Sequence, residues 1–278
     1  MQSAVSKEKM KQFLYAFAVI CLYSCTPKLN PGITTNRPPL ADSAFVLVLD
    51  EGDRFHFRDE IGTINSVDNG ACTYDEAIDK LKQIARSKGA NLVKITEYKK
   101  PDYKNNCDRI TAKIYKVDNV KSYETKFEWS STRKLTWDDY KGTPKPGQDT
   151  NVAATTSCRL GLRMEPGPNV VITNEFICYQ SSVRPTQRKP ALLVHEQLHF
   201  DLCEVYARKL RKELAAAHLT VQNATAVSGN AFLKMHTLYK ERQDLYDEET
   251  NHGLDPEPQA RWQHDIAAEL AAFTAYAR

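Results

Sequence analysis

The chain has 278 residues, which is enough for one large domain or two modest ones. Its hydrophobic fraction of 41% and charged fraction of 26% are typical of a globular protein with a buried core. The formal net charge is +3, and the sequence has no long run of one sign and no basic stripe with interleaved aromatic residues, so we expect no nucleic-acid partner.

The N-terminus is typical of a bacterial lipoprotein signal peptide. Three lysines precede an apolar stretch, Phe13–Tyr23, which is too short to span a bilayer comfortably. The stretch leads into Leu22-Tyr23-Ser24-Cys25, which resembles the site where a signal peptidase cuts before a cysteine that carries the lipid. We predict a signal peptide at 1–24 and a lipidated Cys25; an ordinary cleaved signal or a buried strand is the alternative.

A lipid on Cys25 would place the mature chain in the cell envelope, and we expect the outer membrane, with the protein facing the periplasm. Residues 25–43 are rich in Pro, Thr and Asn, so we interpret them as a flexible tether. Because this compartment is oxidising, we also expect disulfide bonds in the fold.

A small α/β module is predicted at 44–120. Its strands are expected at 45–49, 91–96 and 110–115. A helix is expected at 73–88, beginning with a capping box of Thr73 and Glu76 and ending before Gly89. Gly89-Ala90-Asn91, followed by a strand and later by Cys107 and the Ala-x-Ile-Tyr strand at 112–115, resembles small envelope lipoproteins that use this unit as a sensor or binding module.

Two disulfide bonds are predicted from the positions of the cysteines. Cys72 lies just before the predicted helix and Cys107 just before the last strand of the module, so the two could meet at one end of the sheet. Two free thiols are the alternative. Cys158 and Cys178 lie on two strands predicted further along the chain and could pair across them, which would leave Cys203 free.

A second domain is predicted at 127–278, in an α+β protein. Its strands at 152–163 and 169–179 are joined by Glu165-Pro-Gly-Pro168, a signal typical of a hairpin. Three helices are expected at about 190–218, 226–251 and 257–277. The strand at 170–179 could present an edge to which a peptide adds as a further strand.

The segment His195-Glu196-Gln-Leu-His199 predicts a zinc site. The two histidines are four residues apart, so on a helix they project from one face and can bind one Zn²⁺ together. Glu196 would take a proton from zinc-bound water and hand it to a leaving amine. The apolar residues around the motif favour a buried active-site helix over a surface helix with two solvated histidines.

Helix lengths narrow the search for a third zinc ligand. The first helix continues for about 19 residues beyond His199, and an antiparallel second helix would return to the same level at about residues 244–252. The candidates in this window are Asp244, Asp247, Glu248, Glu249 and His252. We predict His252, because Gly253 lets the chain turn there; Asp247 or Glu249 would then orient a metal-bound histidine. A solvated His252, with Glu248 as the next candidate, is the alternative.

The pattern extends well beyond the zinc-binding motif. The segments that carry it are Leu135–Gly142, Ala153–Ser157, His195–Asp201, Tyr206–Arg208 and Tyr246–Gly253, together with Gln259 and Trp262. They resemble an uncharacterised bacterial family described as predicted secreted zinc-dependent proteases. The resemblance covers nearly all of the second domain and implies a zincin-like peptidase, without naming a substrate. Its second signature includes His252, which also favours this residue as a ligand.

We therefore expect a zinc-dependent peptidase that is bound to the membrane by its lipid and hydrolyses a peptide or protein substrate. The alternative is a non-catalytic lipoprotein with a partner-binding module and a structural zinc site, which four protein ligands would close. Cleavage of a peptide or amide in cell-wall material is a third possibility, because specificity depends on the shape of the pocket.

Replacing the predicted lipidation site tests the membrane anchor. Cys25→Ala should move the protein from the membrane fraction to the soluble fraction, because the sequence offers no other apolar segment that could anchor it. Fractionation after a high-salt wash measures this. Cys21→Ala, inside the predicted signal peptide, is the matched control and should stay in the membrane fraction. Retention of the Cys25 variant would show that the signal has been misread.

Overall fold

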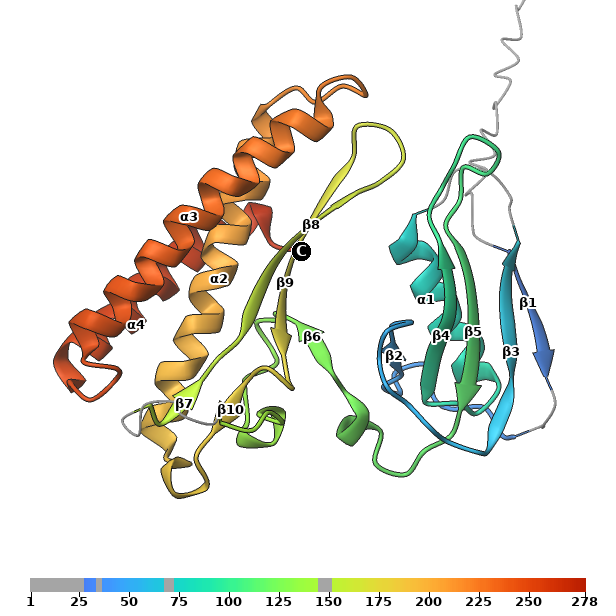
Figure 1. Cartoon of the computed structure of the whole chain (residues 1–278), viewed down its shortest axis with the longest axis horizontal. Helices are drawn as coiled ribbons and strands as arrows, with labels where there is room; N and C mark the ends of the chain where they lie inside the picture. The colour runs from blue at the N-terminus through green and yellow to red at the C-terminus, as the bar shows by residue number, and fades with distance from the viewer. Residues whose placement is uncertain (1–27, 34–36, 68–72, 145–151) are drawn as a thin grey trace, which may run out of the picture.

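The computed structural model describes residues 28–33, 37–67, 73–144 and 152–278. The predicted signal peptide, Cys25 and Cys72 lie outside these ranges. The described residues form an α+β fold, as predicted, with a sheet-and-helix part followed by a part that ends in three long helices (Figure 1). No helix among the described residues is both long and apolar enough to cross a bilayer.

The first part is a five-stranded sheet with one helix packed against it. The strands are β1 Lys28–Ile33, β2 Leu47–Leu49, β3 Glu60–Val67, β4 Leu92–Lys99 and β5 Arg109–Tyr115, and the helix is α1 Tyr74–Ser87. The strand order is β1-β3-β5-β4-β2, and only β2 and β4 pair in parallel. The three predicted strands and the helix are confirmed.

Two strands of this sheet correct the sequence interpretation. β1 lies inside the predicted tether at 25–43, which therefore contributes an edge strand to the fold. This strand was not predicted because Pro31 and Gly32 are typical of loops, although proline is tolerated on an edge strand. β3 was not predicted, because Gly62 and Asn65 interrupt its apolar alternation.

Helix α1 shows why this local prediction succeeded. The Thr73 hydroxyl accepts from the Glu76 amide at 3.3 Å, and the Glu76 carboxylate accepts from the Thr73 amide at 3.1 Å. Gly89 follows the helix with φ +72°, and a Cβ atom there would lie 2.5 Å from the Pro38 carbonyl oxygen. Glycine is therefore required at this helix end.

The second part combines a small sheet with three helices. Its strands are β6 Lys126–Glu128, β7 Ala154–Thr155, β8 Cys158–Met164, β9 Val170–Ile177 and β10 Ser182–Val183. Its helices are α2 Pro190–Ala216, α3 Ala224–Thr250 and α4 Pro256–Ala272. Short 3₁₀ turns are η1 Val120–Tyr123, η2 Trp137–Asp139, η3 Pro185–Gln187 and η4 Thr274–Tyr276. The predicted hairpin and all three predicted helices are present.

Strand β9 is not a free edge. It pairs with β8 on one side and β6 on the other, in the order β6-β9-β8. Where β6 ends, the Arg211 guanidinium donates to the Ile172 carbonyl oxygen at 2.9 Å. The hypothesis that residues 170–179 bind a peptide by strand addition is therefore wrong.

The cysteines differ in part from the prediction. Cys107 is disulfide-bonded, but Cys72 lies outside the described residues, so that pairing stays a prediction. Cys158 and Cys178 are free thiols, and the predicted bond between them is absent. Cys158 lies opposite Phe176 in the ladder, so Cys178, two residues further on, is at best its diagonal neighbour. Diagonal neighbours lie about 7–8 Å apart, which exceeds the Cα separation that a disulfide allows. Cys203 is free and buried, as predicted.

A buried ionic cluster fixes the C-terminal segment on α2. The Glu204 side chain, 3% exposed, accepts from Arg208 at 3.0 Å and from Arg211 at 2.9 Å. Arg208 also donates to the Leu270 carbonyl oxygen at 2.6 Å, and Arg211 to that of Tyr276 at 3.1 Å. One carboxylate therefore neutralises two arginines that hold α4 and the following turn.

Removing this carboxylate charge should destabilise the fold strongly. Glu204→Gln leaves two largely buried arginines without their counter-charge, which should cost about 3 kcal/mol in the free energy of unfolding. Glu213→Gln is the matched control on the same helix, because its partner Lys234 is exposed and such pairs contribute less than about 1 kcal/mol. Urea denaturation measures both, and equal losses would contradict the assigned role of the cluster.

Candidate metal centre

The helix α2 presents His195 and His199 side by side, one turn apart. His195 is almost fully buried, and the two imidazoles meet edge to face with their Nε2 atoms 3.1 Å apart. This geometry confirms that the two side chains share one helix face, as their spacing predicts.

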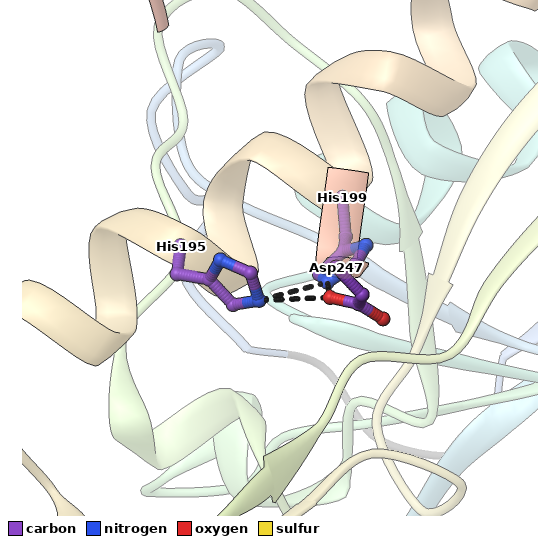
Figure 2. A group of neighbouring side chains, drawn as sticks. All are labelled: His195, His199 and Asp247. Atoms are coloured by element: carbon purple, nitrogen blue, oxygen red, sulfur yellow. Dashed lines mark hydrogen bonds and ion pairs between the residues drawn. The ribbon is translucent and has the colours of Figure 1, made fainter. Parts of the chain in front are cut away.

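Asp247 completes the group from the neighbouring helix α3. Its Oδ1 atom lies 3.1 Å from Nε2 of His195 and 3.0 Å from Nε2 of His199 (Figure 2). The three side chains form a cluster that could hold a metal ion. Asp247 falls within the window at 244–252 that helix lengths predict.

The distances within this cluster fit a metal such as zinc. Imidazole nitrogens and carboxylate oxygens bound to one zinc ion in tetrahedral geometry lie about 3–3.5 Å from one another. The three atoms here have mutual distances of 3.0 to 3.1 Å. The donor set also suits other transition metals that bind imidazole, so the geometry supports a metal without choosing zinc.

Hydrogen bonds at the Nδ1 atoms of the two histidines leave both Nε2 atoms available as ligands. The Gln243 side-chain oxygen accepts from Nδ1 of His199, and the Gln243 amide nitrogen donates to the His199 backbone oxygen at 2.9 Å. The Gln259 oxygen lies 3.2 Å from Nδ1 of His195. When both histidines carry their proton on Nδ1, their Nε2 atoms have only a lone pair to offer. These two lone pairs and the Asp247 oxygen then face one another, and only a cation or a proton between them relieves their repulsion.

The charges in the cluster shift the pKa values in opposite directions. Burial raises the pKa of Asp247, but hydrogen bonds with His195 and His199 outweigh it and hold the pKa well below its usual range. Burial lowers the pKa of His199, but the bond to Asp247 and the charge of Glu196 raise it above the ordinary value. A proton and a metal therefore compete for this site, and metal binding should release a proton.

His252 lies outside the cluster of three ligand atoms. Its side chain is 76% exposed, and its Nδ1 atom lies 3.7 Å from Oδ1 of Asp247. Asn251, His252 and Gly253 have φ values of 50°, 54° and 79°, so the chain makes a left-handed turn here, and His252 lines the same groove as the cluster. Asp247, rather than the predicted His252, is thus the third member of the cluster, and a ligand role for His252 stays a prediction.

The spacing of residues along α3 could have indicated Asp247 as a member of the cluster. Tyr239, Gln243 and Asp247 are four residues apart, and all three line the same groove. Glu249 does not orient a histidine as predicted, because its carboxylate accepts from Trp262 at 2.8 Å and from Arg261 at 2.7 Å.

Glu196 lies beside the cluster and faces the same groove. The residue is 4% exposed, and its carboxylate has no hydrogen-bond partner among the residues that the structure describes. Burial, with the charge of Glu196 as the next cause, raises the pKa of the neighbouring Tyr140 above its usual range. The groove has a volume of about 1780 Å³ and is lined by the segment 152–158, by Glu196 and by all three members of the cluster.

Comparison with known proteins places the cluster within one recognised family region. Residues 186–253 match the family model described as a bacterial protein of unknown function (DUF922). This region is consistent with membership of that family, and it contains His195, His199 and Asp247. No curated protein and no solved structure matches the chain. The family description therefore assigns no activity to the site.

Substitution of the two candidate third ligands tests the site directly. Asp247→Ala should weaken zinc binding more than about 100-fold, because the loss of a ligand exceeds the 10–100-fold effect of losing an outer partner. His252→Asn, which tolerates the left-handed backbone, should weaken it less than about tenfold. Glu248→Ala is the exposed control. Competition with a chelating indicator measures all three, and a larger loss for His252→Asn would restore His252 as the ligand.

Proposed function

We propose that the chain is a zinc-dependent peptidase that hydrolyses a peptide bond with Glu196 as the general base. The observation that carries this proposal is the convergence of His195, His199 and Asp247 in a groove beside a buried carboxylate. A zinc ion held there would supply an activated water at neutral pH.

Glu196 is well suited to move the proton in this reaction. It follows His195 in sequence, and its carboxylate is not engaged by another described side chain, so it can accept a proton from the attacking water. The same carboxyl group would then donate the proton to the nitrogen of the leaving amine. The surrounding groove would exclude bulk water while the substrate is bound.

The number of ligands favours catalysis over the structural alternative. A structural zinc site is closed by four protein ligands, whereas a catalytic site has three and keeps one position open. The described residues offer three ligand atoms, and these border a wide groove. A zinc ion with a purely structural role would not need a buried carboxylate beside it, whereas catalysis needs one such as Glu196 to accept a proton.

The segment beside the groove supports a peptide as the substrate. β7 pairs with β10 in a two-stranded antiparallel sheet. Residues 152–158, which include β7, line the groove together with the three ligands. A groove of this size could accept a peptide alongside this segment.

The envelope location and the lipid anchor on Cys25 remain part of the proposal. Their main support is the N-terminal sequence, which lies outside the described residues. The disulfide bond of Cys107 adds support, because such bonds persist in oxidising compartments.

Glu196→Gln separates proton transfer from metal binding. Glutamine has the same shape but cannot accept the proton, so turnover of a substrate found by peptide-library cleavage should fall by at least about 10²–10⁴-fold. The zinc content should not change, because Glu196 is not among the ligands. Glu213→Gln, about 25 Å further along the same helix, is the control. Undiminished turnover by the Glu196 variant would defeat the mechanism.

A further inference from the structure

The imidazole of His195 is held on several sides by residues 246–259, which come from the end of α3 and the beginning of α4. The Tyr246 ring is stacked on it, with ring centroids 4.7 Å apart and planes 22° apart. A Cβ atom on Gly253 would lie 2.7 to 2.9 Å from three atoms of His195, so the backbone of this turn contacts the ring directly. The ring therefore has little freedom to rotate, and the places of its two nitrogens are fixed.

Within the described ranges, the Nδ1 atom of this ring has one hydrogen-bond partner, the Gln259 side chain. The Gln259 oxygen lies 3.2 Å from Nδ1 of His195 and 3.0 Å from the Tyr246 hydroxyl. An oxygen can only accept, so this contact requires the proton of His195 on Nδ1. The inner nitrogen, Nε2, is then left with a lone pair that faces Asp247.

The other end of the Gln259 amide is unusual. Its Nε2 atom is buried and has no hydrogen-bond partner among the described residues. A buried amide without a partner costs free energy, and few occur in a folded protein. Gln243 differs, because both ends of its amide are paired at His199.

The opposite orientation of the Gln259 amide would change the site. Its NH₂ group would face Nδ1 of His195, which can accept only if the proton moves to Nε2. That proton would lie between His195 and Asp247, where the three ligand atoms converge. The orientation observed therefore favours the metal-binding tautomer, although it leaves the amide nitrogen without a partner.

We propose that Gln259 is a positioning residue that keeps the proton of His195 on Nδ1 and thereby keeps Nε2 free for the metal. This inference rests on the metal site of the proposed function and adds a specific residue outside the region of the family match. The Gln259 oxygen contacts His195 and Tyr246, and Gln259 is not among the residues that line the groove, so it acts on the site through His195.

Two substitutions separate this role from simple packing. Gln259→Met keeps the volume but removes the acceptor, so zinc binding should weaken by about 10–100-fold. Gln259→Glu keeps an acceptor for the Nδ1 proton, so its zinc affinity should equal or exceed that of the unmodified protein. A packing role would give the opposite order, because methionine suits an apolar contact and glutamate buries a charge.

The experiment measures Zn²⁺ affinity of the full chain by competition with a chelating indicator, and circular dichroism checks the fold of each variant. Gln263→Met, exposed on the same helix, is the matched control and should bind zinc normally. Equal affinity of Gln259→Met and the unmodified protein, or equal losses for Met and Glu, would overturn the inference. If Gln259→Met does not fold, Gln259→Ala takes its place in the comparison. Failure of the unmodified protein to bind zinc would instead overturn the proposed function.

Discussion

The antiparallel packing of α3 on α2 is the constraint on which the site depends. It brings the Asp247 oxygen within 3.1 Å of two imidazole nitrogens that α2 holds one turn apart. Without a proton or a metal ion between them, three acceptors at this distance would repel one another, so the fold must supply enough stability elsewhere to keep them together. The buried apolar contacts between α2, α3 and α4 supply it, since all three helices contribute to one core that includes Leu202, Met235 and Trp262.

Helix α2 carries polar residues on more than one side, and each buried one has a partner or faces the groove. Away from the ligands, the Asp201 carboxylate accepts from the Trp129 indole at 2.6 Å and from the Gln197 amide at 2.8 Å. Gln197 in turn accepts from the Leu135 backbone at 2.8 Å. These bonds hold the loop after β6 against the helix, while Glu204 and its arginines hold the C-terminal segment. The helix is thus fixed by polar contacts at its flanks, which leaves His195, Glu196 and His199 positioned for the site.

Sequence reasoning succeeded where the signal was local. The capping box of α1, the hairpin of β8 and β9, and the three long helices each depend on residues close together in the chain. It failed where a strand needed a distant partner or where the exact register of a ladder decided the contact. β1 became a strand because β3 lies beside it, and Cys158 faces Phe176 because of the ladder register. The pairing of β1 depends on a segment many residues away, and the position of Cys158 depends on the register of the β8–β9 hairpin, which the predicted strand ends do not fix.

By itself, the sequence determined the pair of histidines with the adjacent Glu196, because a helix places residues four apart on one face wherever it lies in the fold. It also limited the candidates for a third ligand to residues 244–252, because the lengths of the two helices set where α3 returns to the level of the histidines. Only the tertiary structure placed Asp247, rather than His252, in the cluster with the two histidines, because the side chain of His252 in the turn at 251–253 stays 76% exposed. The orientation of His195 was decided in the same way, because Tyr246, Gly253 and Gln259 meet its ring only after α3 and α4 have packed against α2.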